Sequence, residues 1–112
     1  MRIKLQNIKK MPITIQIEFG GGSEYLFGNK KNIPVTFSKK NLGGKNATVQ
    51  DLLDKMRTEF LQEREELFFQ DKTVRPGVLV LVNDTDWEIL GSEEYELEDK
   101  DVISFISTLH GG

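Results

Sequence analysis

The sequence predicts an α+β fold in which one mixed sheet wraps across one main helix. Two observations support this prediction. A single well-capped amphipathic helix lies between two pairs of strand candidates, and the first and last candidates are apolar and far apart in the chain. These two strands are therefore expected to form the central parallel pair. A chain of 112 residues suits one domain of this kind.

The first strand candidate covers residues 13–19, where apolar and polar side chains alternate with a period of two. Its apolar members are Ile13, Ile15, Ile17 and Phe19. Residues 20–23 are glycine-rich and predict a flexible turn that ends this strand. A second strand is expected at residues 33–37, and Pro34 within it favours an edge position because proline cannot donate to a ladder.

The helix is expected to begin at Thr48. Thr48 and Asp51 have the spacing of a capping box, and the acidic side chain in the first turn suits the positive end of the helix dipole. The helix should run to about Leu61 and pack its apolar stripe on the sheet. That stripe consists of Val49, Leu52, Leu53, Met56 and Phe60.

The second half of the chain contains the remaining strand candidates. Residues 78–82 form an unbroken apolar run, which predicts a strand buried on both faces or nearly so. A turn is expected at residues 83–86, a short return strand at residues 87–90 and a last strand at residues 102–109.

These elements define the expected domain organisation. Residues 12–109 form the domain, residues 1–11 an extension or leader, and residues 110–112 a flexible C-terminal tail. The extension lacks the sustained apolar run and small-residue cleavage site of a secretory signal. The chain has no cysteine and no run apolar enough to cross a membrane, so a cytoplasmic protein, with a nuclear pool as an alternative, is expected.

Composition and motifs argue against a resident catalyst. Gly44 and Lys45 are followed by Asn46, and Lys39 occupies the place of the first P-loop glycine, so a phosphate-binding loop is not expected. A single histidine and no cysteine make a zinc site or a nucleophile–base pair a poor interpretation. The net charge of -3 disfavours direct nucleic-acid binding. We therefore expect no catalytic, cofactor-binding or metal-binding residues, and no enzyme.

The C-terminal Gly111 and Gly112 are the remaining candidates for function. Glycine has no Cβ, so such a tail can lie extended in a channel too narrow for other residues. A carboxylate becomes reactive once it is joined to AMP as an acyl adenylate, and a thiolate or persulfide can then attack it. Since no nucleotide site is predicted here, another protein would have to activate Gly112. The alternative is an ordinary chain end without a role.

Several segments resemble one known family, the ubiquitin-related modifiers of eukaryotic tRNA thiolation. The resemblance covers the chain from about Met11 onward. It is carried by FGGG at residues 19–22 with Glu24 and Leu26–Phe27, RPGVLVLVND at residues 75–84, DWE at residues 86–88 and FISTLHGG at residues 105–112.

This resemblance implies a β-grasp, ubiquitin-like fold and a sulfur carrier and protein modifier. An E1-like activating enzyme with a sulfurtransferase domain would adenylate Gly112 with ATP, and a persulfide would convert it to a thiocarboxylate. Thr108, Leu109, His110 and Gly111 would form the tail that this enzyme receives. A tRNA thiolase complex would pass the sulfur to the wobble uridine of cytosolic tRNA, and lysines of target proteins would be further acceptors. The implied carrier is a monomer that binds neither nucleic acid nor membrane directly.

Two other functions fit the same features. One is a prokaryotic-style sulfur carrier for molybdenum cofactor or thiamine synthesis, which shares the fold and the diglycine. The other is a non-covalent ubiquitin-like interaction domain whose diglycine is incidental. The cofactor-synthesis carrier would be recognised by its partner, because its tail enters a cofactor-building synthase. The interaction domain would be recognised by keeping its partner binding and function when Gly111 and Gly112 are removed.

Overall fold

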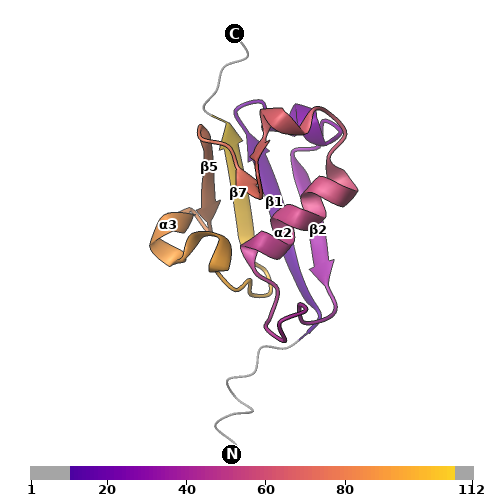
Figure 1. Cartoon of the computed structure of the whole chain (residues 1–112), viewed down its shortest axis with the longest axis vertical. Coiled ribbons are helices and arrows are strands. Elements are labelled where there is room, and N and C mark those ends of the chain that lie inside the picture. Colours follow the sequence, from indigo (N-terminus) through magenta and orange to yellow (C-terminus); the bar gives the residue numbers. More distant parts are fainter. Residues whose placement is uncertain (1–10, 108–112) are drawn as a thin grey trace, which may run out of the picture.

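The computed structural model describes residues 11–107 and contains a five-stranded mixed sheet with one main helix across it (Figure 1). In spatial order the strands are β2 (Asn32–Phe37), β1 (Ile13–Gly20), β7 (Val102–Ser107), β5 (Val78–Val82) and β6 (Thr85–Asp86). Strands β1 and β7 are parallel, and the other neighbours are antiparallel. The predicted central parallel pair and the β-grasp fold are therefore confirmed.

Strand β1 has the alternating burial that its sequence predicts. Its isoleucines face the core, and the polar residues between them face outward. Across the first antiparallel pair, Ile15 lies opposite Val35 and Gln16 lies opposite Pro34. Pro34 is thus in the outermost strand of the sheet, as expected for a residue without a backbone donor.

The main helix α2 (Val49–Lys55) begins with the predicted capping box. Thr48 Oγ1 accepts from the Asp51 amide at 3.3 Å, and Asp51 Oδ2 accepts from the Thr48 amide at 2.8 Å. The helix continues as one π-helical turn, η2 (Met56–Phe60), which the Leu61 amide closes onto the Met56 carbonyl. The predicted end near Leu61 is confirmed.

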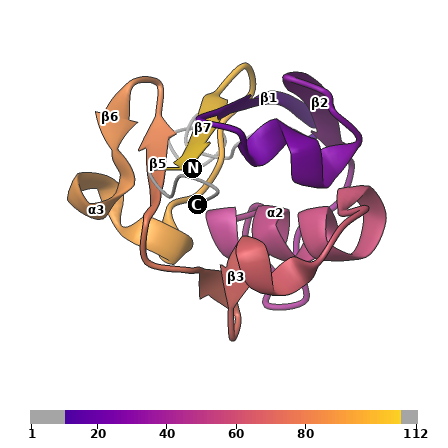
Figure 2. The ribbon, with the colours of Figure 1, turned by 90° about the horizontal axis from the view of Figure 1, so that it is seen from above.

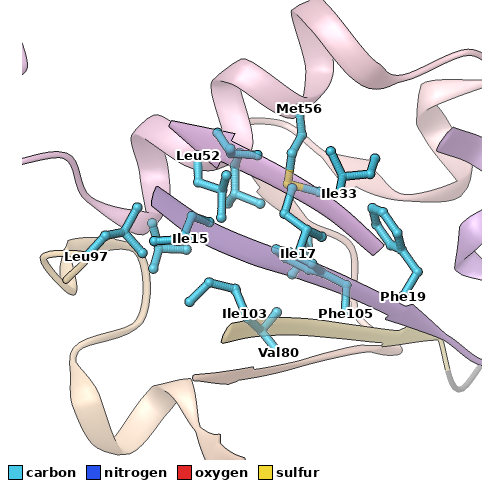
Figure 3. Packing of buried hydrophobic residues seen from close by; sticks show 14 of the residues in the cluster. Ile15, Ile17, Phe19, Ile33, Leu52, Met56, Val80, Leu97, Ile103 and Phe105 are labelled. Atoms are coloured by element: carbon cyan, nitrogen blue, oxygen red, sulfur yellow. The ribbon is translucent and has the colours of Figure 1, made fainter. Parts of the chain in front are cut away.

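The core lies between this helix and one face of the sheet, so the fold has two layers (Figure 2). Figure 3 shows Leu52 and Met56 pointing from the helix toward Ile15 and Ile17 of β1, with Ile103 on β7 beside them. These five side chains are at most 1% exposed. Each contributes about 1.5–3 kcal/mol by leaving water, so the packing of helix on sheet is the main source of stability.

Residues 87–90 are a correction to the sequence analysis. They form the short helix α3 (Trp87–Leu90) instead of a return strand. The Asp86 carboxylate accepts from the Glu88 amide at 2.9 Å, and Gly91 closes the turn in the left-handed conformation at φ 109. The return strand does exist, but as β6, which ends one residue before this helix.

Strand β5 is also less buried than predicted. Val80 and Val82 are each 1% exposed, whereas Leu79 is 39% exposed on the opposite face. The reason is that α2 covers only one face of the sheet. The prediction of a strand buried on both faces or nearly so is therefore wrong for β5.

The remaining elements fill the connections between these strands and helices. The two-residue strands β3 (Phe69–Gln70) and β4 (Thr73–Val74) form a small separate hairpin, which the sequence analysis did not predict. Three 3-10 turns complete the described chain: η1 (Ser23–Phe27), η3 (Glu65–Leu67) and η4 (Ser92–Glu94). Between residues 11 and 107, no helix combines the length and the apolar character needed to cross a membrane.

Candidate functional site at the end of the last strand

The predicted site residues lie at the C-terminal end of the chain. Thr108, Leu109, His110, Gly111 and Gly112 are all outside residues 11–107, which are the residues that the structure describes. The described part of the site consists of the strand that leads to these residues and of the residues around the end of that strand.

Strand β7 is paired with β1 as far as Ile106 and with β5 as far as its last residue, Ser107. Ser107 lies opposite Val78 of β5, and Ile106 lies opposite both Leu79 of β5 and Gly20 of β1. Figure 1 shows β7 in the middle of the sheet, between these two strands. Because β7 is a central strand, two ladders of hydrogen bonds fix the position from which the C-terminal residues begin.

The turn after β1 presses directly against the end of β7. Gly21 has φ +67, and an ideal Cβ at this residue would lie 2.1 Å from the backbone oxygen of Ser107. Only glycine fits such an approach. The turn predicted to end β1 is confirmed, and it is packed against β7 and followed at once by η1.

The buried hydroxyl of Ser23 ties this turn to the same strand. Its Oγ lies 2.8 Å from the carbonyl oxygen of Gly20 and 2.9 Å from that of Phe105, so its proton is shared between the two acceptors. Ser23 is only 2% exposed. A hydrogen bond of this kind in a dry environment resists opening, because the buried hydroxyl would be left without a partner.

A cluster of phenylalanine rings lies under this end of the sheet. Phe105 of β7 is 5.5 Å from Phe68 and 6.1 Å from Phe19, measured between ring centroids. Phe27 of η1 stacks on Phe19 at 4.6 Å and meets Phe68 edge-on at 4.9 Å. Figure 3 shows Phe19 and Phe105 side by side. The end of β7 therefore rests on closely packed aromatic side chains.

The buried Asp101 carboxylate lies at the opposite end of β7, just before the strand begins. It accepts hydrogen bonds from the Tyr95 hydroxyl, the Asn83 amide group and the Glu98 backbone amide, each at 2.9 Å. Burial and this carboxylate both raise the pKa of Tyr95 above its usual range, because they penalise the phenolate. With all three donors directed at one carboxylate, the cluster is structural and not an acid–base pair.

Other candidate sites in residues 11–107 are weak. No group of three or more His, Cys, Asp or Glu residues in this part of the chain could hold a metal ion. A cleft of about 250 Å³ lies beside the start of α2. It is lined by Lys45, Thr48, Gln50, Glu93, Glu94 and Glu96. Nothing in this cleft pairs a nucleophile with a base.

Comparison with known proteins points to one family. Residues 14–112 match the family described as Urm1 (Ubiquitin related modifier). A ubiquitin-related modifier 1 homolog of Dictyostelium discoideum is 53% identical over 98 residues, which cover 88% of this chain and 98% of that protein. A homolog of the same name from Drosophila grimshawi is 52% identical over 100 residues, covering 89% and 92%. The solution structure of Urm1 from Trypanosoma brucei superposes with a TM-score of 0.74 at 36% identity, covering 92% of this chain and 99% of that one.

A single β-grasp domain whose central strand leads to a diglycine end defines the class of ubiquitin-like modifiers and sulfur carriers. The matched residues 14–112 include both that domain and the diglycine. The chain belongs to the Urm1 (ubiquitin related modifier) family. It is accordingly a modifier and sulfur carrier, and not itself an enzyme.

Proposed function

We propose that the C-terminal carboxyl group of Gly112 is the reacting group of this protein and that it carries sulfur as a thiocarboxylate. The observation that supports this most directly is the family match, which extends through the last residue and so includes the diglycine. The proposed partner is an E1-like activating enzyme with a sulfurtransferase domain. ATP and a persulfide would be used by that enzyme and not held by this chain.

The proposed chemistry has three steps. A Gly112 carboxylate oxygen attacks the α-phosphate of ATP, which gives an acyl adenylate and releases pyrophosphate. The terminal sulfur of an enzyme persulfide then attacks the acyl carbon and displaces AMP, which leaves an acyl disulfide. A second thiol cleaves its sulfur–sulfur bond, becomes part of a new disulfide and releases Gly112 as a thiocarboxylate.

The described residues hold the strand from which the proposed tail begins. The proposed tail, Thr108 to Gly111, begins directly after Ser107, whose strand is bonded on both sides. Five residues in extended conformation span at most about 17 Å, so the reacting carboxyl group cannot lie further than this from the end of β7. We propose that the activating enzyme receives the tail as an extended chain, for which glycine at the last two positions is well suited.

The sulfur would then move to an acceptor outside this chain. We propose the wobble uridine of cytosolic tRNA, reached through a separate tRNA thiolase complex, and so no direct contact between this chain and RNA. A lysine amine of a target protein is the second proposed acceptor. Its attack on the activated Gly112 carbonyl would form an isopeptide bond and expel the sulfur. We propose that the carrier works as a monomer in the cytoplasm, with the nucleus as a further location.

An intact-mass measurement tests the central step. The purified chain is incubated with an E1-like activating enzyme, ATP and a sulfur donor, and the mass of the C-terminal peptide is determined. The expected product has one sulfur in place of one oxygen at Gly112. No change in mass, with an enzyme shown to activate a known substrate, would refute the proposal.

Deletion of Gly112 is the matched control. The deletion should abolish the sulfur adduct and leave thermal unfolding unchanged, because a terminal glycine has no side chain to bury. The alternative carrier for cofactor synthesis is distinguished in the same assay by offering the thiocarboxylate either to a tRNA thiolase or to a cofactor synthase. The segments NDTDWE (residues 83–88) and STLHGG (residues 107–112), which resemble the eukaryotic modifiers, favour the first acceptor. A non-covalent interaction domain would keep its cellular function after the deletion.

A further inference from the structure

We infer that Gly21 is a positioning residue, which fixes the direction in which the C-terminal residues leave the sheet. It acts through its contact with the backbone of Ser107. The inference rests on the proposed function, since this direction matters only if Gly112 has to reach an active site on another protein. Three features support it: the close approach of Gly21 to the backbone of Ser107, the buried hydroxyl of Ser23, and the neighbouring Gly22, which makes no such approach.

The approach of Gly21 to Ser107 leaves no room for a side chain. An ideal Cβ at Gly21 would lie 2.1 Å from the Ser107 oxygen and 3.0 Å from both its carbonyl carbon and its amide nitrogen. All three atoms are backbone atoms, so a rotamer change cannot relieve the overlap. Either the turn or the end of β7 would have to move.

The turn that contains Gly21 is held in place on both sides of this residue, by Gly20 and by Ser23. Gly20 is in register with Ile106, and the Ser23 hydroxyl is bonded to the carbonyls of Gly20 and Phe105. On the far side of β7, Val78 lies opposite Ser107. A side chain at position 21 would therefore push the last residue of β7 out of the sheet and not push the turn away from it.

A displacement at Ser107 changes the place from which the C-terminal residues start. Gly112 is five residues further on in the sequence and would have to reach an active site at a fixed place relative to the bound domain, so a shifted start changes whether it can reach that site. Misplacement of a reacting group by about 1 Å can lower the rate by about 100-fold. Gly21 thus determines whether the Gly112 carboxyl group can reach the active site when the activating enzyme binds the domain.

Gly22 provides a control within the same turn. It also has a positive φ, +95, so an L-residue there is strained in the same way as at Gly21. The nearest atom to its ideal Cβ is in the Tyr25 ring, at 3.9 Å, which is ordinary contact. Gly21→Ala and Gly22→Ala therefore share backbone strain, but only Gly21→Ala disturbs Ser107.

The experiment compares these two variants with the wild-type chain. Steady-state kinetics of adenylate formation are measured with an E1-like enzyme, together with amide NMR spectra of the free proteins. In Gly21→Ala we expect kcat to fall about 10- to 100-fold, with KM within about two-fold, because the outer surface of the domain is unchanged. The Ser107 amide signal should shift in this variant. Gly22→Ala should keep both the kcat and the Ser107 signal of the wild-type chain.

Ser23→Ala serves as a second variant, because it removes the hydroxyl without adding a clash. A lower kcat at constant KM is expected for Ser23→Ala as well. If Gly21→Ala does not fold, the kcat of Ser23→Ala tests the inference in its place. Equal kcat values for Gly21→Ala, Gly22→Ala and wild type would overturn the inference, as would a wild-type kcat for Ser23→Ala. Failure of the wild-type chain to be adenylated would instead refute the proposed function.

Discussion

The Tyr95 hydroxyl donates a 2.9 Å hydrogen bond to Oδ2 of Asp101, a carboxylate that is only 6% exposed. The same carboxylate also accepts from Asn83, whose own Oδ1 accepts from the Val102 amide. One side chain thereby joins the acidic connection after α3, the turn after β5 and the first residue of β7. The network holds the start of the central strand, as the turn at Gly21 holds its end.

Replacement of Tyr95 by phenylalanine should destabilise the fold at neutral pH. The variant loses a hydrogen bond to a charged acceptor in a partly exposed position, so the free energy of unfolding should fall by about 1–2 kcal/mol. Urea denaturation followed by circular dichroism measures this change. Tyr25→Phe is the control, because Tyr25 is 65% exposed and its loss of a hydroxyl should be neutral. An effect of equal size at both tyrosines would contradict the role of the network.

The same hydrogen bond predicts a dependence on alkaline pH. The pKa of Tyr95 is raised in the folded protein, so above the usual tyrosine pKa of about 10 the unfolded chain loses this proton first. The stabilising contribution of Tyr95 is therefore complete below that pH and declines above it. The difference in unfolding free energy between wild type and Tyr95→Phe should narrow between pH 9 and pH 11, which are about one unit either side of the tyrosine value. A constant difference over this range would exclude the linkage.

Loss of the helix cap at Thr48 should lower the free energy of unfolding of the whole domain. Thr48→Ala removes the acceptor of the Asp51 amide at the start of α2, and the expected cost is about 1 kcal/mol. Thr48→Ser keeps the hydroxyl and should recover most of that loss. Thermal unfolding of the three proteins tests the prediction, and a Thr48→Ser variant as unstable as Thr48→Ala would show that the methyl group, and not the cap, is responsible.

Much of the fold follows from local patterns in the sequence. The alternation in β1, the capping box at Thr48 and the edge position of Pro34 each have a physical cause within a few residues. Helix α3 could not be predicted in this way, because four residues are too few to show a helical period. Its cap Asp86 and its closing Gly91 were visible in the sequence, but the apolar residues between them favoured a strand.

The contacts around the end of β7 could not be predicted from local patterns in the sequence. Glycine at positions 20–22 is equally consistent with a flexible turn and with a close approach. The distinction depends on Ser107, which is distant in sequence and adjacent only in the folded protein. Burial of the Ser23 hydroxyl is likewise a result of tertiary packing. The predicted roles of Thr108 to Gly112 came from the chain end and the family resemblance, and they remain predictions.

Phe68 offers a test of the aromatic packing beneath the end of β7. Its side chain is fully buried, and its ring centroid is 4.9 Å from Phe27 and 5.5 Å from Phe105. Phe68→Ala would leave a cavity among these rings and should cost about 3–5 kcal/mol, a large share of the total for a small domain. Chemical denaturation measures the loss.

The position of this cavity leads to a more specific expectation. Because Phe105 is only two residues before Ser107, the amides of β7 near its end should exchange with solvent faster in Phe68→Ala than the amides of β2. Phe68→Leu should show the same pattern to a smaller degree, and Leu42→Ala, at a fully exposed loop residue, should change neither stability nor exchange. Uniform acceleration across β2 and β7 would mean that the rings stabilise the domain as a whole and give no particular support to the strand that carries the tail.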